Sequence, residues 1–413
     1  MLDATKVAHT PAFVLEYDAF LRNLTLIRGL QEELPCTFLF ALKGFGMHRV
    51  FKEIATCAQG ATASSLNEAR LASEFFASVH AYAPVYQPEE FDAIAKLSSH
   101  ITFNSVDQYA RYKDRLQTSL AGLRVNPKYE VVETALYDPC SLGSRLGINP
   151  KNLEKLPQGI TGLHIHNLCE SGAKEMKGTL ESVETLYGRF FPQITWLNLG
   201  GGHLVTRVGY DLKLFKETVL AFNKKYPHIE LIFEPGAAYV WETGVLVSEI
   251  LDIVEGDGIQ TLILDTSFTA HMPDCLEMPY TPRVRGARIV GDEREEVGLE
   301  EEKQDDTQKT KEEEKEQEND TKEQKKEESA SRTGHRFRLG GSSCLAGDWV
   351  GTYLFPTLPK IGDRLVFEDM MHYTMVKTTM FNGIAHPDIG IFRDGAYEVV
   401  KQFSYEDYKG RLS

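Results

Sequence analysis

A lysine follows an apolar run near the N-terminus, and this combination can support covalent chemistry. Lys43 comes directly after the segment Thr37-Phe38-Leu39-Phe40-Ala41-Leu42 and before Gly44-Phe45-Gly46. Burying an unpaired ammonium is costly, so a lysine at the end of a buried strand tends to lose its proton and become a nucleophilic amine. Such an amine can form a Schiff base with a carbonyl group. The alternative is a strand whose lysine extends its charge into solvent.

Two histidines also stand at the end of an apolar segment. In Leu163-His164-Ile165-His166 they lie two residues apart, which predicts that both point to the same face of a strand. His166, at the end of that strand, could stack on a flat cofactor. A zinc pair is the competing interpretation, but the sequence shows no evident third ligand nearby, so no metal site is predicted.

A glycine triplet and a glutamate follow two further apolar segments. Gly200, Gly201 and Gly202 would let backbone N–H groups approach a phosphate, although a tight turn is an equally good explanation of the triplet alone. Glu234, in Glu234-Pro235-Gly236, could bond a protonated ring nitrogen and so strengthen a pyridine ring as an electron sink.

The elements that must position these residues alternate between apolar and helical segments. Asp18 to Glu33 shows the helical spacing of leucines, and the apolar segments are 37–42, 60–64, 80–83, 100–104, 120–125, 160–166, 194–199 and 230–233. These segments predict a (β/α)₈ barrel. Lys43, His166, the glycine triplet and Glu234 all follow such strands, where barrel enzymes gather their chemistry.

After Glu234 this alternation stops. Segments 245–254, 261–265, 336–339, 364–367 and 397–403 predict strands with few helices between them, and therefore a second, mainly β domain. We expect the barrel to span 11–240, the β domain to span 241–413, and residues 1–10 to join the β domain. A low-complexity charged insert at 291–334 interrupts the β domain, and we treat it as a surface loop without a catalytic role.

Composition limits the class of protein. The chain has 413 residues, 42% of them hydrophobic, and a net charge of −15, to which the insert contributes 18 acidic and 9 basic side chains. This charge argues against nucleic acid as a partner. No apolar run is long enough to cross a membrane, and no signal peptide is evident. The scattered cysteines (36, 57, 140, 169, 275 and 344) fit reduced thiols and predict a cytoplasmic protein.

Six motifs in this order resemble the pyridoxal-phosphate decarboxylases of alanine-racemase fold. They are Ala41-Leu42-Lys43, Cys140 to Gly147, Leu163 to His166, Leu199 to His203, Glu234-Pro235-Gly236 and Gly341 to Asp348, so the resemblance covers nearly the whole chain except the insert. Within that superfamily, Ser267 to Asp274 and Cys344 to Asp348 look most like the carboxynorspermidine/carboxyspermidine decarboxylases. One departure is that Ala237 stands where the family often has a glutamate after Glu-Pro-Gly.

The resemblance implies a role for each matching residue. Lys43 would hold pyridoxal phosphate covalently, the Gly200 to Gly202 loop and Tyr373 would bind its phosphate, His166 would lie against its ring, and Arg145 would help fix Lys43 and the hydroxyl side of the ring. Glu234 would face the ring nitrogen. Cys344, contributed by the other subunit of a homodimer with shared active sites, would return a proton to the substrate. Asp265, Asp274 and Asp348, together with Glu234, would meet a polyamine carboxylate substrate, since ammonium groups pair with carboxylates.

Two alternatives remain open at this point. A diaminopimelate or ornithine/arginine-type decarboxylase would keep the fold and change the substrate. A noncatalytic carrier of pyridoxal phosphate would contain only the barrel. The sequence does not distinguish carboxyspermidine from carboxynorspermidine.

Overall fold

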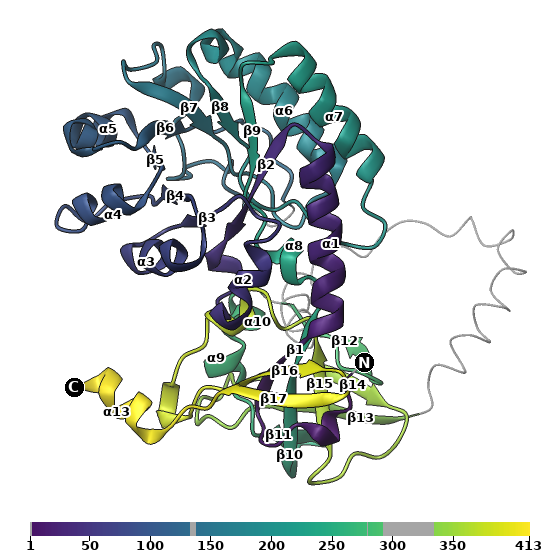
Figure 1. Cartoon of the computed structure of the whole chain (residues 1–413). Helices are drawn as coiled ribbons and strands as arrows, with labels where there is room; N and C mark the ends of the chain where they lie inside the picture. Colours follow the sequence, from purple (N-terminus) through teal and green to yellow (C-terminus); the bar gives the residue numbers. More distant parts are fainter. Residues whose placement is uncertain (1, 133–137, 279, 292–333) are drawn as a thin grey trace, which may run out of the picture. The chain divides into compact units, whose positions relative to one another are not determined.

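The computed structural model describes residues 2–132, 138–278, 280–291 and 334–413. The chain divides into two compact units, shown in Figure 1. One comprises Tyr17–Thr243, and the other combines Met1–Glu16 with Gly244–Ser413.

The first unit is a barrel of parallel strands. Among its described residues, eight strands close on themselves, because β2 pairs with both β3 and β9. The strands are β2 (Cys36–Ala41), β3 (Gly60–Ala63), β4 (Val79–Tyr82), β5 (His100–Phe103), β6 (Leu120–Arg124), β7 (Ile160–His164), β8 (Trp196–Asn198) and β9 (Glu230–Phe233). Each coincides with one of the apolar segments, so the predicted (β/α)₈ barrel is confirmed.

In Figure 1 the longer helices lie around the outside of the barrel. The helices of this unit either precede the first strand or follow a strand. They are α1 (Tyr17–Glu33), α2 (Phe51–Ile54), α3 (Leu66–Phe75), α4 (Phe91–Leu97), α5 (Val106–Tyr112), α6 (Ala173–Tyr187), α7 (Leu212–Lys225) and α8 (Ala237–Val240). Three of the helices begin at a side-chain cap: Ser65, Ser105 and Asp211 each accept a hydrogen bond from a backbone N–H in the first turn. These caps fix where helices start after strands β3, β5 and β8.

A tryptophan fills part of the barrel interior. Trp196, on β8, is buried, and glycines on the two preceding strands make room for its ring. A Cβ added at Gly122 or Gly162 would lie 2.1 or 2.0 Å from the indole. Alanine at either position would therefore clash, which explains why these short strands contain glycine at these points.

The second unit is a mixed β-sheet. Its described residues form nine strands in the order β12-β14-β13-β11-β10-β1-β16-β17, with β15 also paired to β10. Their bounds are β1 (Ala12–Glu16), β10 (Gly244–Gly256), β11 (Ile259–Leu264), β12 (Arg288–Gly291), β13 (His335–Gly340), β14 (Trp349–Phe355), β15 (Arg364–Glu368), β16 (Asp388–Arg393) and β17 (Ala396–Lys401). The helices are α9 (Phe268–His271), α10 (Pro273–Glu277) and α13 (Tyr405–Leu412). The mainly β architecture of this unit is as predicted.

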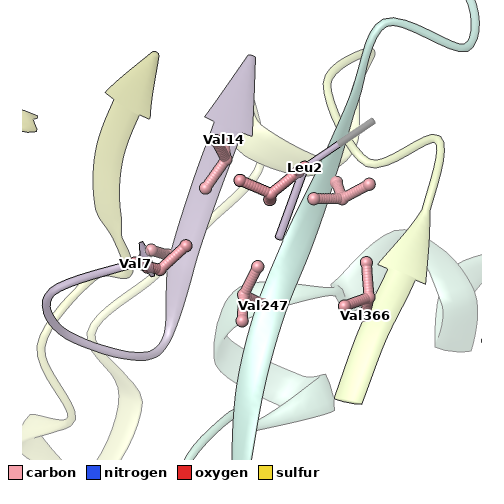
Figure 2. Close-up of a cluster of buried hydrophobic side chains, with 7 residues drawn as sticks. Leu2, Val7, Val14, Val247 and Val366 are labelled. Carbon is pink, nitrogen blue, oxygen red and sulfur yellow. The ribbon is translucent and has the colours of Figure 1, made fainter. Parts of the chain in front are cut away.

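The opening strand belongs to this sheet, whereas the sequence interpretation began the barrel at residue 11. Strand β1 pairs antiparallel with β10 and parallel with β16. Val14 on β1 packs into a buried cluster that Figure 2 shows, with Leu2, Val7, Val247 and Val366. A short apolar strand carries no local signal of which sheet it joins, so only this long-range pairing reveals its place.

The charged insert predicted at 291–334 lies outside the described residues, apart from its end residues Gly291 and Gly334. Strand β12 ends at the first of these, and β13 begins directly after the second. None of the described helices is long and apolar enough to cross a membrane.

Candidate active site

A cavity of about 190 Å³ opens among the C-terminal ends of the barrel strands. Lys43 and Glu234 come directly after β2 and β9, while Tyr82, Arg124 and His164 are the last residues of β4, β6 and β7. The full lining is Lys43, Thr62, Ser64, Tyr82, Arg124, Pro139, Leu146, His164, His166 and Glu234. This is the edge at which barrel enzymes carry their active sites.

Lys43 presents a reactive amine to this cavity. It lies in a 3₁₀ turn, Leu42–Gly44, directly after β2 rather than in the strand itself. Its Nζ is 3.5 Å from His166 Nε2. The side chain is exposed because it faces the cavity, yet protein surrounds the amine, and burial followed by the charge of Arg124 lowers its pKa. Both causes disfavour the ammonium, so the structure favours a neutral nucleophile.

The turn that carries Lys43 packs closely against the turn after β9. A Cβ added at Gly44 would lie 3.2 Å from Gly236 Cα, and one added at Gly236 would lie 3.0 Å from the carbonyl oxygen of Ala41. Glycine at both positions lets the two backbones approach. This contact sets Lys43 and Glu234 at neighbouring points of the cavity.

His166 is oriented by the glycine loop. The N–H of Gly201 donates to His166 Nδ1 at 3.3 Å, so a neutral imidazole carries its proton on Nε2, facing Lys43. Burial and the positive charges of Lys43 and Arg124 hold the pKa of His166 well below its usual range. The imidazole is therefore neutral and can donate a hydrogen bond to the lysine amine.

Glu234 is a buried carboxylate with a fixed orientation. Its Oε1 accepts a hydrogen bond from Asn198 Nδ2 at 2.7 Å, and its backbone N–H donates to the carbonyl of Gly200 at 2.7 Å. Burial raises its pKa, whereas the hydrogen bond from Asn198 and the nearby Lys43 oppose that rise. Such a carboxylate can accept a hydrogen bond from a protonated ring nitrogen.

The glycine triplet allows three strand ends to approach one another. Gly200 and Gly202 have φ of +66° and +88°, in the left-handed region that favours glycine. A Cβ at Gly201 would lie 2.8 Å from the backbone oxygen of Glu234. Two of the N–H groups already have partners, since Gly200 donates to Asn198 Oδ1 and Gly201 to His166 Nδ1. Phosphate binding by this loop stays a prediction.

Arg124 and Tyr82 line the cavity but were not predicted. The guanidinium of Arg124 lies 4.8 Å above the ring of Tyr82, and its Nη2 donates to the backbone oxygen of His166 at 2.8 Å. Arg124 is buried although it is charged. It ends an apolar strand, and Lys43 likewise follows an apolar run, so the argument applied to the lysine also applies to Arg124.

Arg145, which was predicted to help fix the cofactor, is exposed and is not among the residues that line the cavity. Its backbone oxygen accepts a hydrogen bond from Asn104 Nδ2, and the next residue, Leu146, does line the cavity. Among the described lining residues, the arginine is Arg124.

Cys344, the predicted proton donor, lies in the sheet unit and is exposed. Its backbone N–H donates to Asn382 Oδ1 at 2.9 Å, which fixes the loop that carries the thiol. Asn382 itself has φ of +57°, a conformation that asparagine tolerates better than most residues.

The three predicted substrate aspartates differ in their surroundings. Asp348 is buried, and its carboxylate accepts hydrogen bonds from Ser267 Oγ and from the backbone N–H groups of Thr269 and Ser343. Asp265 Oδ1 accepts from Ser248 Oγ and the N–H of Glu249. These hydrogen bonds tie both carboxylates to neighbouring residues of the sheet unit, and their contact with the substrate stays a prediction.

Asp274 keeps one oxygen without such a partner. Its Oδ2 accepts hydrogen bonds from Tyr280 Oη at 2.7 Å and Thr374 Oγ1 at 2.8 Å. Its Oδ1 is buried and has no hydrogen-bond partner among the described residues. Thr374 follows Tyr373, a half-buried residue with φ of +54°. Asp274 and the Tyr373 segment are thus neighbours within the sheet unit.

Three side chains at the cavity lie close enough together to bind a metal ion. The ligand atoms of His164, His166 and Glu234 lie within 4.8 Å of one another, so Glu234 could supply the third ligand that the sequence does not reveal. Arg124 lines the same cavity, and its positive charge opposes a cation. A nucleophilic amine, a neutral imidazole and a carboxylate fit pyridoxal phosphate instead.

Comparison with known proteins identifies the class. Residues 17–371 match the family described as pyridoxal-dependent decarboxylase, C-terminal sheet domain. The chain belongs to these pyridoxal-dependent decarboxylases, and its cofactor is pyridoxal phosphate.

Relatives that act on carboxylated polyamines match almost the whole chain. A Synechocystis sp. protein named carboxyaminopropylagmatine decarboxylase is 47% identical over 409 residues, which is 98% of this chain and 95% of that protein. A Campylobacter jejuni protein named carboxynorspermidine/carboxyspermidine decarboxylase is 37% identical over 405 residues, 97% of this chain and 98% of that protein.

Solved structures of decarboxylases also resemble this chain. The crystal structure of carboxynorspermidine decarboxylase complexed with norspermidine from Campylobacter jejuni matches with a TM-score of 0.82 and 35% identity, over 98% of this chain and 100% of that one. Diaminopimelate decarboxylase from Helicobacter pylori, complexed with L-lysine, matches with a TM-score of 0.75 at 14% identity, over 99% of each chain, and shows the fold alone.

Proposed function

We propose that this enzyme removes the α-carboxylate of a carboxylated triamine, of the carboxyspermidine or carboxynorspermidine type, in polyamine biosynthesis. The observation that carries the proposal is the group of Lys43, His166 and Glu234 in one cavity of a chain that matches a carboxynorspermidine/carboxyspermidine decarboxylase over 97% of its length. A carrier containing only the barrel does not fit, because the family match extends through the sheet unit to residue 371.

The residues of the barrel would hold the cofactor. Lys43 would bind it covalently, His166 would lie against its ring, Glu234 would face its ring nitrogen, and the Gly200 to Gly202 loop would bind its phosphate with Tyr373. When bound, pyridoxal phosphate supplies an electron sink for the bond that breaks. Burial and the charge of Arg124 lower the pKa of Lys43 and so favour the neutral amine that reacts. Arg145 would assist from the neighbouring loop.

Decarboxylation then requires one proton transfer. The bond between the α-carbon and the carboxylate breaks, CO₂ leaves, and the electron pair stays with the α-carbon. Cys344 Sγ would return a proton to that carbon. The exposed position of the thiol in the sheet unit supports this role, since a donor must reach the substrate.

The acidic residues would recognise the cationic part of the substrate. Asp274 supports this role best, because its Oδ1 has no partner among the described residues. An ammonium or guanidinium group pairs with a carboxylate and is repelled by an arginine. Asp265 and Asp348 would act indirectly, by holding the loops around the site.

A guanidinium-ended substrate is a second candidate. The specific observation that favours it is the 47% identity to the Synechocystis sp. carboxyaminopropylagmatine decarboxylase. Ammonium and guanidinium ends differ in shape and donor number, because guanidinium forms planar, paired hydrogen bonds. The two substrates therefore require different partners around the same carboxylates.

A parallel assay would test the proposal. Purified protein with pyridoxal phosphate is offered carboxyspermidine, carboxynorspermidine, carboxyaminopropylagmatine, diaminopimelate and ornithine, and products are resolved by mass. Spermidine or norspermidine as the favoured product supports the proposal, whereas aminopropylagmatine as the favoured product supports the second candidate. Lysine or putrescine as the favoured product would overturn it.

We further propose a homodimer with shared active sites, in the cytoplasm. The exposure of Cys344 in the sheet unit supports a site completed by a second subunit, and the scattered spacing of the cysteines in the sequence supports a reducing compartment. Sedimentation at micromolar concentration should show twice the 46.5 kDa chain mass. A monomer would contradict the shared site.

A further inference from the structure

His164 is a buried histidine that the proposed mechanism leaves without a task. It is almost fully buried, and its Nε2 has no hydrogen-bond partner among the described residues. That nitrogen lies 3.7 Å from Glu234 Oε2, which is just beyond hydrogen-bond distance. Buried polar groups without a partner are rare in folded proteins, so this atom needs an explanation.

The strand register directs His164 toward Glu234. Strand β7 pairs with β8, and His164 stands opposite Asn198 in that register. Asn198 Nδ2 already donates to Glu234 Oε1 at 2.7 Å. Neighbouring residues on two adjacent strands therefore face the two oxygens of one carboxylate.

Two further side chains hold the imidazole in this orientation. The ring centroids of Tyr82 and His164 lie 5.3 Å apart, and the two ring planes make an angle of 74°. The guanidinium of Arg124 covers Tyr82 at 4.8 Å and is itself fixed by its hydrogen bond to the backbone oxygen of His166. A ring packed in this way has few other directions in which to point its nitrogen.

We propose that His164 is a positioning residue for Glu234, whose Nε2–H donates to Oε2 when the cofactor occupies the site. Asn198 and His164 would then hold both carboxylate oxygens and keep the carboxylate aimed at the cofactor ring. This inference rests on the proposed role of Glu234. A neutral imidazole serves this purpose, because it donates one hydrogen bond and adds no charge beside Lys43.

A series of substitutions tests the hydrogen bond apart from the fold. Glutamine places an amide N–H near the position of Nε2, asparagine is too short to reach Oε2, and leucine removes the donor. Binding of pyridoxal phosphate to the apoprotein, followed by absorbance, should stay within about threefold of wild type in His164→Gln. It should weaken about tenfold or more in His164→Asn and His164→Leu.

A matched control and a double substitution separate positioning from packing. His100 is another histidine of the barrel, and its ring centroid lies 3.9 Å from that of His80. It is not among the residues that line the cavity, so His100→Leu should leave cofactor affinity unchanged. In a Glu234→Gln background, His164→Asn should weaken binding by less than about twofold, because the carboxylate is gone.

The result that overturns the inference is equal affinity of the glutamine and asparagine variants, or an asparagine effect as large in the Glu234→Gln background as in wild type. The asparagine and glutamine pair keeps the test valid if the leucine variant fails to fold. Failure of the wild-type enzyme to decarboxylate would instead contradict the proposed function, so the two failures are distinguishable.

Discussion

The Lys43 amine reacts only when it is neutral, so its pKa controls how the enzyme takes up its cofactor. Burial and the charge of Arg124 both disfavour the ammonium and lower this pKa. The neutral fraction at a given pH below the pKa of ordinary lysine is therefore larger in the folded protein.

We predict that Arg124→Gln moves covalent capture of pyridoxal phosphate to higher pH. Removing the cation removes one of the two causes that lower the pKa, so the pKa of Lys43 rises and less amine is neutral at each pH. The rate of the absorbance change on mixing apoprotein with cofactor, measured across pH, reports the shift. Arg115→Gln, which changes an arginine packed on Phe91 outside the cavity lining, is the control. An unchanged pH curve for Arg124→Gln would refute the effect.

We predict that Asp348→Asn lowers turnover while leaving cofactor binding intact. The buried carboxylate accepts three hydrogen bonds, one of them from Ser343 in the loop before it, and in either orientation an amide would place its NH₂ group against one of the two backbone donors. Losing such bonds costs about 1–3 kcal/mol. Because that loop carries Cys344, the proposed proton donor, its displacement should lower kcat about tenfold or more. Unchanged kcat together with lowered Tm would show that Asp348 acts on stability alone.

At the scale of elements, the glycine loop after β8 brings three strand ends together. A Cβ at Gly201 would lie 2.8 Å from the backbone oxygen of Glu234 and 3.2 Å from His166 Cε1. We predict that Gly201→Ala displaces both residues and weakens pyridoxal phosphate binding about tenfold or more. Affinity for the cofactor, measured by absorbance titration, checks this.

Gly29 offers the matched control for that substitution. It lies in helix α1, and a Cβ there meets nothing within 4 Å. Gly29→Ala should leave cofactor affinity unchanged and stabilise the protein by about 0.5–1 kcal/mol, since alanine favours helix more than glycine does. Equal effects of the two substitutions on cofactor affinity would contradict the close approach at Gly201.

The barrel could be predicted from the sequence because its strands are buried on both faces and form continuous apolar runs, such as Phe38 to Ala41. The strands of the sheet unit were harder to predict. Strands β12, β14 and β16 were not predicted, and β1 was placed with the barrel, because the pairing of Ala12–Glu16 with residues more than two hundred positions away leaves no local pattern.

Motifs marked three of the residues that line the cavity, Lys43, His166 and Glu234. Lys43, His166, the glycine triplet and Glu234 surround one region of the barrel. Arg124 and Tyr82 were missed because a single arginine or tyrosine after an apolar run normally extends to solvent. The hydrogen bonds that occupy Asp348 come from residues far away in sequence, so the sequence could not show that its carboxylate is already used.

At the scale of the whole molecule, the proposed site draws on two subunits. Lys43 belongs to the barrel unit and Cys344 to the sheet unit. If each site takes these residues from different subunits, then mixing Lys43→Ala and Cys344→Ala proteins restores one intact site in each mixed dimer. We predict about 25% of wild-type activity in an equimolar mixture, because half of the dimers are mixed and each regains one of two sites.

Each variant alone should be almost inactive in this experiment, which makes the recovered activity easy to detect. The mixture must be allowed to exchange subunits, and recovery should rise with exchange time. Activity that stays at the level of the separate variants after exchange would show that both residues act within one chain.

The most direct test of the central claim is decarboxylation of carboxyspermidine, carboxynorspermidine and carboxyaminopropylagmatine by the holoenzyme in D₂O, with CO₂ and product mass measured together. We predict one CO₂ for each product molecule and one carbon-bound deuterium in the product, with neither formed by Lys43→Ala. No CO₂ from any of the three substrates, or equal CO₂ release by Lys43→Ala, would contradict the account.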